Sequence, residues 1–392
     1  MRSKLLISTL FIATFGFGQP TMTIATTLAI TPEVTTFAGS GSSGSANGTG
    51  TAASFIYPHG VAVDGSGNVY VGGANNHLIR KITSAGVVTT LAGSGSSGSA
   101  NGTGTAASFY FPKGVAVDGS GNVYVADQNN NLIRKITSAG VVTTLAGGGG
   151  SGYLGSGSDD GIGTEASFYN PSGVAVDLSG NVYVADWENH LIRKITSAGV
   201  VTTLAGSGSV GSTDGTGTEA SFTYPWGIAV DGSGNVYVAD LYNHLIRKIT
   251  AAGVVSTLAG SGSEGSADGT GTAASFHSPY DVALDGSGNV YVADLNNHLI
   301  RKITSAGVVT TLAGSGSQGS ANGTGTAASF YYPARVAVDG SGNVYVADTY
   351  NHLIRKITSA GVVSTLAGSG SSGSADGTGT AASFDRPQGV AV

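Results

Sequence analysis

The sequence predicts an all-β propeller made of four-stranded antiparallel blades, six of them complete and one split between the two ends of the chain. The first observation is a repeated stretch, written in full as NVYVADLNNHLIRKIT. Versions of it begin at Asn68, Asn122, Asn181, Asn235, Asn289 and Asn343. The spacings are 54, 59, 54, 54 and 54 residues, and a period near 50 is typical of propellers and other repeat arrays. The second observation is 65 Gly, placed mostly in Gly/Ser blocks between short runs of Val, Ile, Thr and Tyr, with no sustained helical period.

Each repeat contains four strand-like runs of four to seven residues. In the first repeat the predicted strands are Gly60–Asp64, Asn68–Val71, Leu78–Thr83 and Val87–Ala92. Short Gly-containing links join them, as hairpins require, so the four strands form an antiparallel meander. The runs are apolar on both faces, and one blade alone cannot cover them. Neighbouring blades must therefore supply the core, and we expect Phe55 and its equivalents to anchor the linkers in it.

The two ends of the chain carry parts of one more repeat. Thr31–Gly39 matches the fourth strand, and Gly389–Val392 matches the first strand. The Asp that ends each first strand would next fall at position 393, because 339 plus 54 is 393. We therefore expect one propeller domain over residues 31–392, truncated at its C-terminus, with a blade shared between the two ends.

Residues 1–29 are typical of a signal peptide. Arg2 and Lys4 precede Leu5–Phe17, an apolar run of 13 residues that is short for a membrane span of about 20 residues. Cleavage after Gly18 and cleavage after Ala29 are both compatible with the small residues there, and an uncleaved anchor is the alternative. We expect a secreted, periplasmic or cell-surface protein with no membrane insertion after cleavage.

Composition excludes several classes of site and partner. The chain has no Cys, so it has no disulfides, no thiolate metal site and no lipoprotein attachment. Loss of Arg2 and Lys4 changes the net charge from −6 to −8. An acidic chain whose Arg-Lys pairs are spread evenly through the repeats is not expected to bind nucleic acid. The sequence does not indicate an oligomeric state.

A tripeptide in the repeat identifies a family. Asn-His-Leu recurs with its His at His77, His190, His244, His298 and His352. Together with the preceding GNVYVAD and the following IRKI, the chain from about Thr31 to its end resembles the NHL-repeat β-propeller family, as a secreted bacterial-type member. The resemblance implies a propeller, often six-bladed, that is used mainly for binding; some relatives are lyases or lactonases. Asn131 and Gly73 depart from the pattern, where His and Asp are expected.

The repeated polar residues are interpreted as structural. Equivalent histidines of successive blades cannot converge on one metal ion, whose ligands must lie within about 2 Å. We expect each His to hydrogen-bond within its own blade, for example to Asp186, and Arg80 and its equivalents to pair with neighbouring Asp. Asp64–Asn68 resembles the start of a calcium loop but lacks the later ligands, so it is read as a hairpin turn. No cofactor is predicted, although weak calcium binding at Asp159 and Asp160 stays open.

Function is expected where the repeats differ from one another. One variable set precedes each first strand, and the other lies between the second and third strands; in an up-and-down blade both emerge on the same face. The candidate binding residues are His59, Lys113, Trp187, Glu188, Trp226, Tyr242, His277, Tyr280, Arg335 and Tyr350. Aromatic side chains with a few charges are typical of recognition surfaces. Drift in loosely constrained loops is the competing interpretation.

The sequence thus favours a secreted, non-enzymatic binding scaffold for a protein, peptide or glycan. Against an enzyme stands the near-identity of the Val-Ala-Val-Asp first strands, since a catalytic centre on the axis needs different residues from different blades. The first alternative is a metal-dependent lyase or lactonase-like enzyme using His59, His277, Tyr280, Asp281, Arg335 or Glu188. The second is a structural or adhesive surface protein in which the number of blades matters more than any residue.

Overall fold

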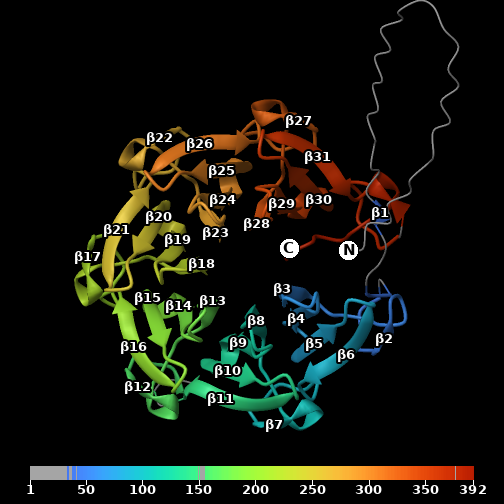
Figure 1. The fold of residues 1–392 in the computed structure, drawn as a ribbon, viewed down its shortest axis with the longest axis vertical. Helices are drawn as coiled ribbons and strands as arrows, with labels where there is room; N and C mark the ends of the chain where they lie inside the picture. The colour runs from blue at the N-terminus through green and yellow to red at the C-terminus, as the bar shows by residue number, and fades with distance from the viewer. Residues whose placement is uncertain (1–32, 35–37, 41, 149, 151–154, 376) are drawn as a thin grey trace, which may run out of the picture. The chain divides into compact units, whose positions relative to one another are not determined.

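A computed structural model describes residues 33–34, 38–40, 42–148, 150, 155–375 and 377–392. The predicted signal peptide, residues 1–29, lies outside the described residues. The described residues form a ring of six five-stranded antiparallel sheets, each sheet being one blade (Figure 1). Among the described residues, no helix is long and apolar enough to cross a membrane.

The blades repeat one set of strands. The innermost strands are β3 (Pro58–Val63), β8 (Pro112–Val117), β13 (Pro171–Val176), β18 (Pro225–Val230), β23 (Pro279–Leu284) and β28 (Pro333–Val338). The second strands are β4 (Val69–Gly73), β9 (Val123–Asp127), β14 (Val182–Asp186), β19 (Val236–Asp240), β24 (Val290–Asp294) and β29 (Val344–Asp348). The third strands are β5 (Leu78–Ile82), β10 (Leu132–Ile136), β15 (Leu191–Ile195), β20 (Leu245–Ile249), β25 (Leu299–Ile303) and β30 (Leu353–Ile357). The fourth strands are β6 (Val87–Ala92), β11 (Val141–Gly147), β16 (Val200–Ala205), β21 (Val254–Ala259), β26 (Val308–Ala313) and β31 (Val362–Ala367).

A fifth, two-residue strand that the sequence did not predict completes each blade on its outer edge. These strands are β2 (Gly48–Thr49), β7 (Gly102–Thr103), β12 (Gly161–Ile162), β17 (Gly215–Thr216), β22 (Gly269–Thr270) and β27 (Gly323–Thr324). Each lies in the linker from the preceding blade and pairs with the fourth strand of the next, as Gly215 pairs with Val255. The linker therefore joins the outer edge of a blade before the chain crosses to the axis.

Short 3-10 helices occupy two places in the repeat. One set follows the outer strand: η1 (Gly104–Ala106), η4 (Gly163–Glu165), η6 (Gly217–Glu219), η8 (Gly271–Ala273), η10 (Gly325–Ala327) and η12 (Gly379–Ala381). The other set joins the second strand to the third: η2 (Gln128–Asn130), η5 (Trp187–Asn189), η7 (Leu241–Asn243), η9 (Leu295–Asn297) and η11 (Thr349–Asn351). Four of the ten predicted binding residues, Trp187, Glu188, Tyr242 and Tyr350, lie in the second set.

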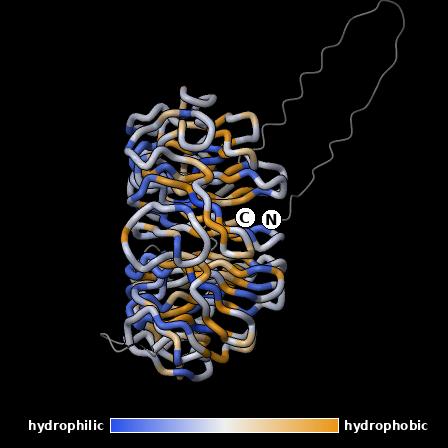
Figure 2. Tube along the Cα trace, turned by 90° about the vertical axis from the view of Figure 1, so that its left-hand side faces the viewer, coloured by the Kyte–Doolittle hydropathy of each residue, from blue (hydrophilic) through white to orange (hydrophobic). Residues whose placement is uncertain are grey.

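The core lies between blades, as the apolar strands predicted. At the junction of blades four and five, Tyr237, Ala239 and Ile246 pack against Phe276 and Val292. Equivalent clusters occupy the other junctions from blade one to blade six, and hydrophobic segments run through the body of the ring (Figure 2). The linker phenylalanines Phe109, Phe168, Phe222, Phe276 and Phe330 are fully buried, as expected of anchors, whereas Phe55 and Phe384 beside the split blade are only half-buried.

A partial blade from the two ends lies between blades six and one. β1 (Glu33–Val34) pairs with β32 (Gly377–Thr378) in the register that the fourth and outer strands use elsewhere. On the inner side, Thr349 Oγ1 donates to the carbonyl oxygen of Pro387 at 2.9 Å. A Cβ built on Gly389 would lie 3.0 Å from the carbonyl oxygen of His59, so this segment also contacts blade one. The predicted arrangement of six complete blades and one split blade is confirmed.

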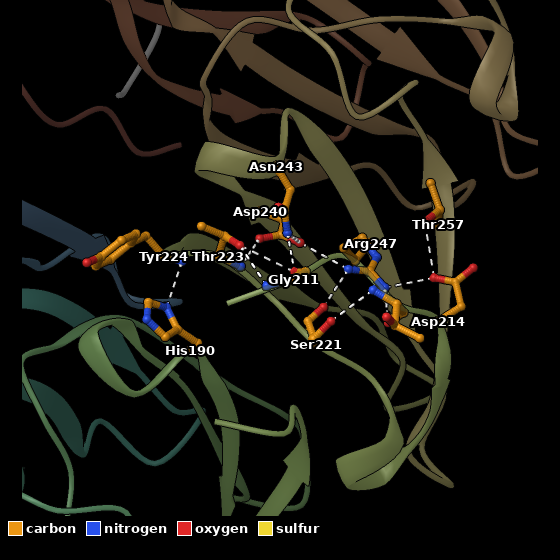
Figure 3. A network of polar contacts seen from close by, with 11 residues as sticks. His190, Gly211, Asp214, Ser221, Thr223, Tyr224, Asp240, Asn243, Arg247 and Thr257 are labelled. Carbon is orange, nitrogen blue, oxygen red and sulfur yellow. Dashed lines mark hydrogen bonds and ion pairs between the residues drawn. The ribbon is translucent and has the colours of Figure 1, made fainter. Parts of the chain in front are cut away.

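A buried Arg-Asp network joins strands in blades two to six, as predicted for the equivalents of Arg80, whereas Arg80 itself has no Asp partner among the described residues (Figure 3). In blade four, Arg247 Nη1 lies 3.0 Å from Asp240 Oδ2, and both side chains are fully buried. Asp240 also accepts bonds from Asn243 Nδ2 and from the backbone N–H of Thr223, each at 2.8 Å. Arg247 Nη2 donates to Asp214 in the outer linker at 2.7 Å. One network therefore joins the second strand, the third strand and the linker.

The Asp-Gly-Ser-Gly-Asn links are hairpin turns, as predicted. Asp64 Oδ1 accepts the backbone N–H groups of Ser66 and Asn68 at 2.9 Å, and Oδ2 accepts Asn68 Nδ2 and the Tyr70 hydroxyl. The carboxylate thus closes its own turn. The weak calcium site at Asp159 and Asp160 stays a prediction, although Asp160 Oδ1 already accepts a bond from Arg193 at 2.8 Å.

Blade one lacks the network's carboxylate, and restoring it should stabilise the ring. Gly73 stands where the other blades have Asp, and Arg80 is buried with only carbonyl and amide acceptors. Both amide atoms of Asn76 are buried without a partner among the described residues. We expect Gly73→Asp to raise the free energy of unfolding by about 1–3 kcal/mol, because it supplies charged hydrogen bonds to both groups. Urea denaturation measures this, and Gly73→Ala is the control: equal stabilisation by Ala would contradict the explanation.

Candidate functional site

The motif histidines join neighbouring blades, so the prediction of a bond within the blade is wrong. His190 Nδ1 accepts the backbone N–H of Tyr224 in the next blade at 3.1 Å (Figure 3). The equivalent pairs are His77–Phe111, His244–Ser278, His298–Tyr332 and His352–Arg386, at 3.0–3.3 Å. The carboxylates expected as partners are already occupied by Arg, Asn and backbone N–H groups, and the left-handed backbone of each His directs the ring toward the next blade. The histidines are therefore structural.

Asn131 shows which substitution these positions accept. It has the same left-handed backbone as the histidines, and its Oδ1 accepts the N–H of Asn170 at 2.9 Å. We expect His190→Asn to change the free energy of unfolding by less than about 0.5 kcal/mol, whereas His190→Ala should cost about 1–3 kcal/mol through the lost acceptor and the left-handed backbone. Thermal and urea unfolding of the two variants test this. Equal losses would contradict it.

We expect the stability of the unchanged protein and that of His190→Asn to depend differently on pH. Burial lowers the pKa of His190, so the unfolded chain binds its proton first as the pH falls. The contribution of His190 is therefore complete above about pH 6.5 and is lost as the pH falls toward the folded-state pKa. The loss of stability between pH 7.5 and pH 5 should be smaller in His190→Asn than in the unchanged protein. Comparing the two cancels the titration of the buried aspartates, which burial shifts the other way.

The innermost strands begin earlier than predicted, so they include variable residues, and His59, Asp281 and Arg335 among these line the cavity at the axis. The expected start was Gly60; the strand starts at Pro58, ahead of a register shift between Pro58 and Val61. The residue after each Pro therefore lies in the strand, and these residues are His59, Lys113, Ser172, Trp226, Tyr280 and Ala334. The expectation that first strands bring only repeated residues to the axis is wrong.

The next position holds Gly in four complete blades because adjacent innermost strands nearly touch there. A Cβ on Gly60 or Gly114 would overlap a backbone carbonyl oxygen of the next blade, and one on Gly227 would lie 2.7 Å from that of Tyr280. Blades five and six instead carry Asp281 and Arg335, which form an ion pair at 3.1 Å. On sequence, Asp281 enters only the enzymatic alternative. The fact that Asp281 stands where four other blades have Gly could have marked it as a candidate binding residue.

The axis holds a small cavity with an unusual set of charges. Its volume is about 180 Å³. All six innermost strands contribute to its wall, with His59, Asp281 and Arg335 as its charged or titratable side chains, and Gly389 and Val390 of the C-terminal segment complete it. Burial, together with the charges of Arg335 and Lys113, lowers the pKa of His59 to about 3, so the imidazole is neutral. Burial and the charge of Arg335 lower the pKa of Lys113 to about 8. Lys113 lies on the neighbouring innermost strand β8, and its ammonium reaches over the ring of Trp226 on β18.

An aromatic arc extends outward from the axis over blades three to six. It is defined by Trp187, Tyr224, Trp226, Tyr242, Tyr280, Tyr331, Tyr332 and Tyr350. Trp187 contacts Tyr224 and Trp226, with ring centroids 5.3 and 5.5 Å apart, and Trp226 contacts Tyr280 at 5.1 Å. Tyr350 contacts Tyr331 and Tyr332 at 5.3 and 5.2 Å. The two variable sets therefore meet, as their expected position on one face requires.

The predicted binding residues separate into three groups. His59, Lys113, Trp226, Tyr280 and Arg335 lie on innermost strands, near the axis. Trp187, Glu188, Tyr242 and Tyr350 lie in the turns between second and third strands. His277 lies apart from both, with its Nε2 3.6 Å from Glu264 Oε1. Trp226 is only 7% exposed, so it supports the surface more than it forms it.

A second cavity adjoins the arc. Its volume is about 430 Å³, and Tyr280, Tyr332, Tyr350 and Gln388 are among the residues of its wall. It lies among blades five and six and the C-terminal segment. Aromatic side chains and a few polar groups around a concave site are typical of ligand pockets.

Comparison with known sequences finds the repeat and its relatives. The family model described as NHL repeat matches residues 55–82, 109–136, 168–195, 222–249, 276–303 and 330–357. Protein SUPPRESSOR OF QUENCHING 1, chloroplastic, of Arabidopsis thaliana is 32% identical over 67% of this chain and 26% of its own length. NHL repeat-containing protein 2 of Bos taurus is 30% identical over 72% of this chain and 43% of its own length. The chain thus spans well under half of these curated relatives.

Solved structures share the fold at low identity. An auxiliary nutrient binding protein from Bacteroides ovatus has a TM-score of 0.55 and 19% identity, over 83% of this chain and 76% of that one. A streptogramin B lyase has a TM-score of 0.52 and 14% identity, over 78% of this chain and 81% of that one. Identities this low show a shared propeller architecture alone.

Proposed function

The chain belongs to the NHL-repeat family of β-propellers, and from that premise we propose that it is a non-enzymatic binding module for a protein, peptide or glycan. The proposed binding face is formed by the connections that precede the innermost strands and by the turns between second and third strands. Export of the protein to the periplasm, cell surface or medium is part of the same proposal.

The observation that carries the proposal is the separation of repeated from variable residues. The repeated polar residues have partners inside the scaffold: Arg247 with Asp240, and His190 with Tyr224. The variable residues gather instead at the axis and in the aromatic arc. The blades are near-identical, so the residues that differ between them are the ones able to give selective recognition.

The outer part of the arc is both exposed and rigid. Tyr242 and Tyr350 are 56% and 46% exposed. Their backbone N–H groups donate to the carbonyl oxygens of Thr223 and Tyr331 at 3.3 and 3.1 Å, and their rings contact other rings of the arc. Exposed aromatic side chains that are already ordered lose little entropy on binding, which favours affinity.

Two substitutions that the repeat itself suggests test the face. Blades one, two and five have Asn75, Asn129 and Asn296 where blades four and six have Tyr242 and Tyr350. We expect the double variant Tyr242→Asn/Tyr350→Asn to unfold at an unchanged urea concentration and to lose at least about tenfold in affinity for a ligand selected on glycan and peptide arrays. Leu178→Gly is the control, because Leu178 is 97% exposed and lies in the turn between a first and a second strand, outside both variable sets. Unchanged binding by the double variant would contradict the face assignment.

The enzymatic alternative draws on the charged cluster at the axis. His59, Lys113, Asp281 and Arg335 come from four different blades, and such convergence of unlike residues is typical of catalytic centres. The donor set fits a metal poorly, because the cluster contains two cations and one carboxylate, and that carboxylate is paired with Arg335. Metal analysis of the purified protein separates the two functions: a stoichiometric Zn²⁺ or Ca²⁺ would favour the enzyme.

A further inference from the structure

The charges at the axis do not balance within the protein. Lys113 and Arg335 contribute two positive charges, Asp281 contributes one negative charge, and His59 is neutral. The axis therefore carries a net charge of about +1 in a chain whose formal net charge is −6. A cation held in a partly enclosed site attracts a counter-charge, because the surroundings solvate it less well than bulk water does.

Lys113 and Arg335 both have N–H donors that are available to a ligand. The ammonium of Lys113 lies over the rings of Phe111 and Trp226, 5.5 and 5.0 Å from their centroids. Among the described residues it has no carboxylate partner. Arg335 uses Nη1 for Asp281, and its guanidinium lies over the Tyr280 ring at 5.7 Å. A guanidinium has five N–H donors, so most of them remain for other acceptors.

His59 adds a buried polar atom without a partner. Its Nδ1 is buried and bonds to nothing among the described residues, although the ring forms part of the cavity wall. Buried polar atoms almost always have hydrogen-bond partners, and an exception calls for a missing water, ion or ligand. With its hydrogen on Nδ1, the neutral imidazole donates one more bond into the cavity.

The charge count and the size of the cavity select the ligand. A phosphate carries about −1.5 to −2 near neutral pH, more than the net charge of about +1 compensates, and it would face Asp281. A carboxylate carries a single charge and matches the fork of a guanidinium. The volume of about 180 Å³ suits a small ligand or one small end group more than a drug-sized molecule.

We propose that His59, Lys113 and Arg335 form an axial binding site for the carboxylate of a small organic acid. Asp281 orients Arg335 through their ion pair and excludes doubly charged anions. This site deepens the proposed function and rests on it, because it gives the binding face a charged centre. The carboxylate can be carried by a sugar acid or by a short aliphatic acid, so both are needed as probes.

The affinity for the acid should depend on pH in one direction. Lys113 loses its charge as the pH rises through about 8, and His59 is neutral throughout that range. Binding of a carboxylate should therefore weaken between pH 7 and pH 9. A Lys113→Arg variant should bind with little change over the same range, because arginine stays charged.

Calorimetric titration of the full chain with D-glucuronate and with L-lactate tests the site, with D-glucose and inorganic phosphate as controls. We expect one or both acids to bind at pH 7, glucose not to bind, and phosphate to bind more weakly than the acids. Lys113→Gln should lower the affinity at least about tenfold. The matched control is Lys135→Gln: the ammonium of Lys135 also lies over a ring, that of Tyr124, but in the body of its blade.

Several outcomes would overturn the site. They are the absence of binding by either acid to folded protein, tighter binding of phosphate, and an equal loss in Lys113→Gln and Lys135→Gln. Failure here is distinguishable from failure of the proposed function. If array ligands bind and depend on Tyr242 and Tyr350 while neither acid binds, the face assignment stands and the axial site is wrong.

Discussion

Replacing Asp240 by Ala should lower the free energy of unfolding by about 3–5 kcal/mol, because Arg247 stays charged and buried but loses its buried carboxylate and keeps only the half-exposed Asp214. The same change removes the acceptor for Asn243 Nδ2 and for the Thr223 N–H. Asp240→Asn should lose less, since the amide oxygen can still accept a bond. Urea denaturation followed by circular dichroism measures both variants.

A double variant separates the charge from the packing. In Asp240→Ala/Arg247→Met no buried charge is left unpaired, since Asp214 is half exposed, so part of the loss should be recovered. Met is also able to keep contact with the Phe222 ring, over which the guanidinium lies at 5.0 Å. A loss below about 1 kcal/mol in Asp240→Ala, or no recovery in the double variant, would show that the buried network does not hold the blade.

Gly114→Ala should be the second severe change, although it adds only one methyl group. Its Cβ would overlap the carbonyl oxygen of Ser172 in the next blade, and backbone cannot rotate aside as a flexible side chain can. Overpacking of this kind typically costs 1–3 kcal/mol, and the rigid contact places the expected loss at the upper end, at about 3 kcal/mol.

The matched control for Gly114 lies five residues later. A Cβ on Gly119, in the hairpin turn after the same strand, has no heavy atom within 4 Å, so Gly119→Ala should change stability by less than about 0.5 kcal/mol. Thermal and urea unfolding of the two variants provide the comparison. Equal stability of Gly114→Ala and the unchanged protein would contradict the close approach of innermost strands.

Most of the scaffold could be predicted because it depends on sequence patterns that recur in all six repeats. Val-rich runs, Gly turns and the Arg and Phe positions each have a local cause, and the core clusters confirm them. The two-residue outer strands could not be predicted, since two residues have no period. They form only because the linker of one blade meets the fourth strand of the next.

The site was harder to predict than the scaffold for two physical reasons. The register shift after Pro58 accompanies a longer innermost strand that includes His59, and propensity gives no sign of such a shift. The left-handed backbone at His190 directs its ring to the next blade, which a pattern of residues within one blade does not reveal. The variable residues themselves were correctly chosen as the positions that differ; whether they bind a ligand stays a proposal.

The central claim is that the repeat builds the scaffold and its exceptions bind. The most direct test replaces four variable residues by the residues that other blades carry at the same positions. The variant is Tyr242→Asn/Asp281→Gly/Tyr350→Asn/Arg335→Gly. Its binding to glycan and peptide arrays is then compared with that of the unchanged protein, alongside urea unfolding. We predict an unchanged unfolding midpoint and loss of the array signal; a folded variant that binds as the unchanged protein does would contradict the claim.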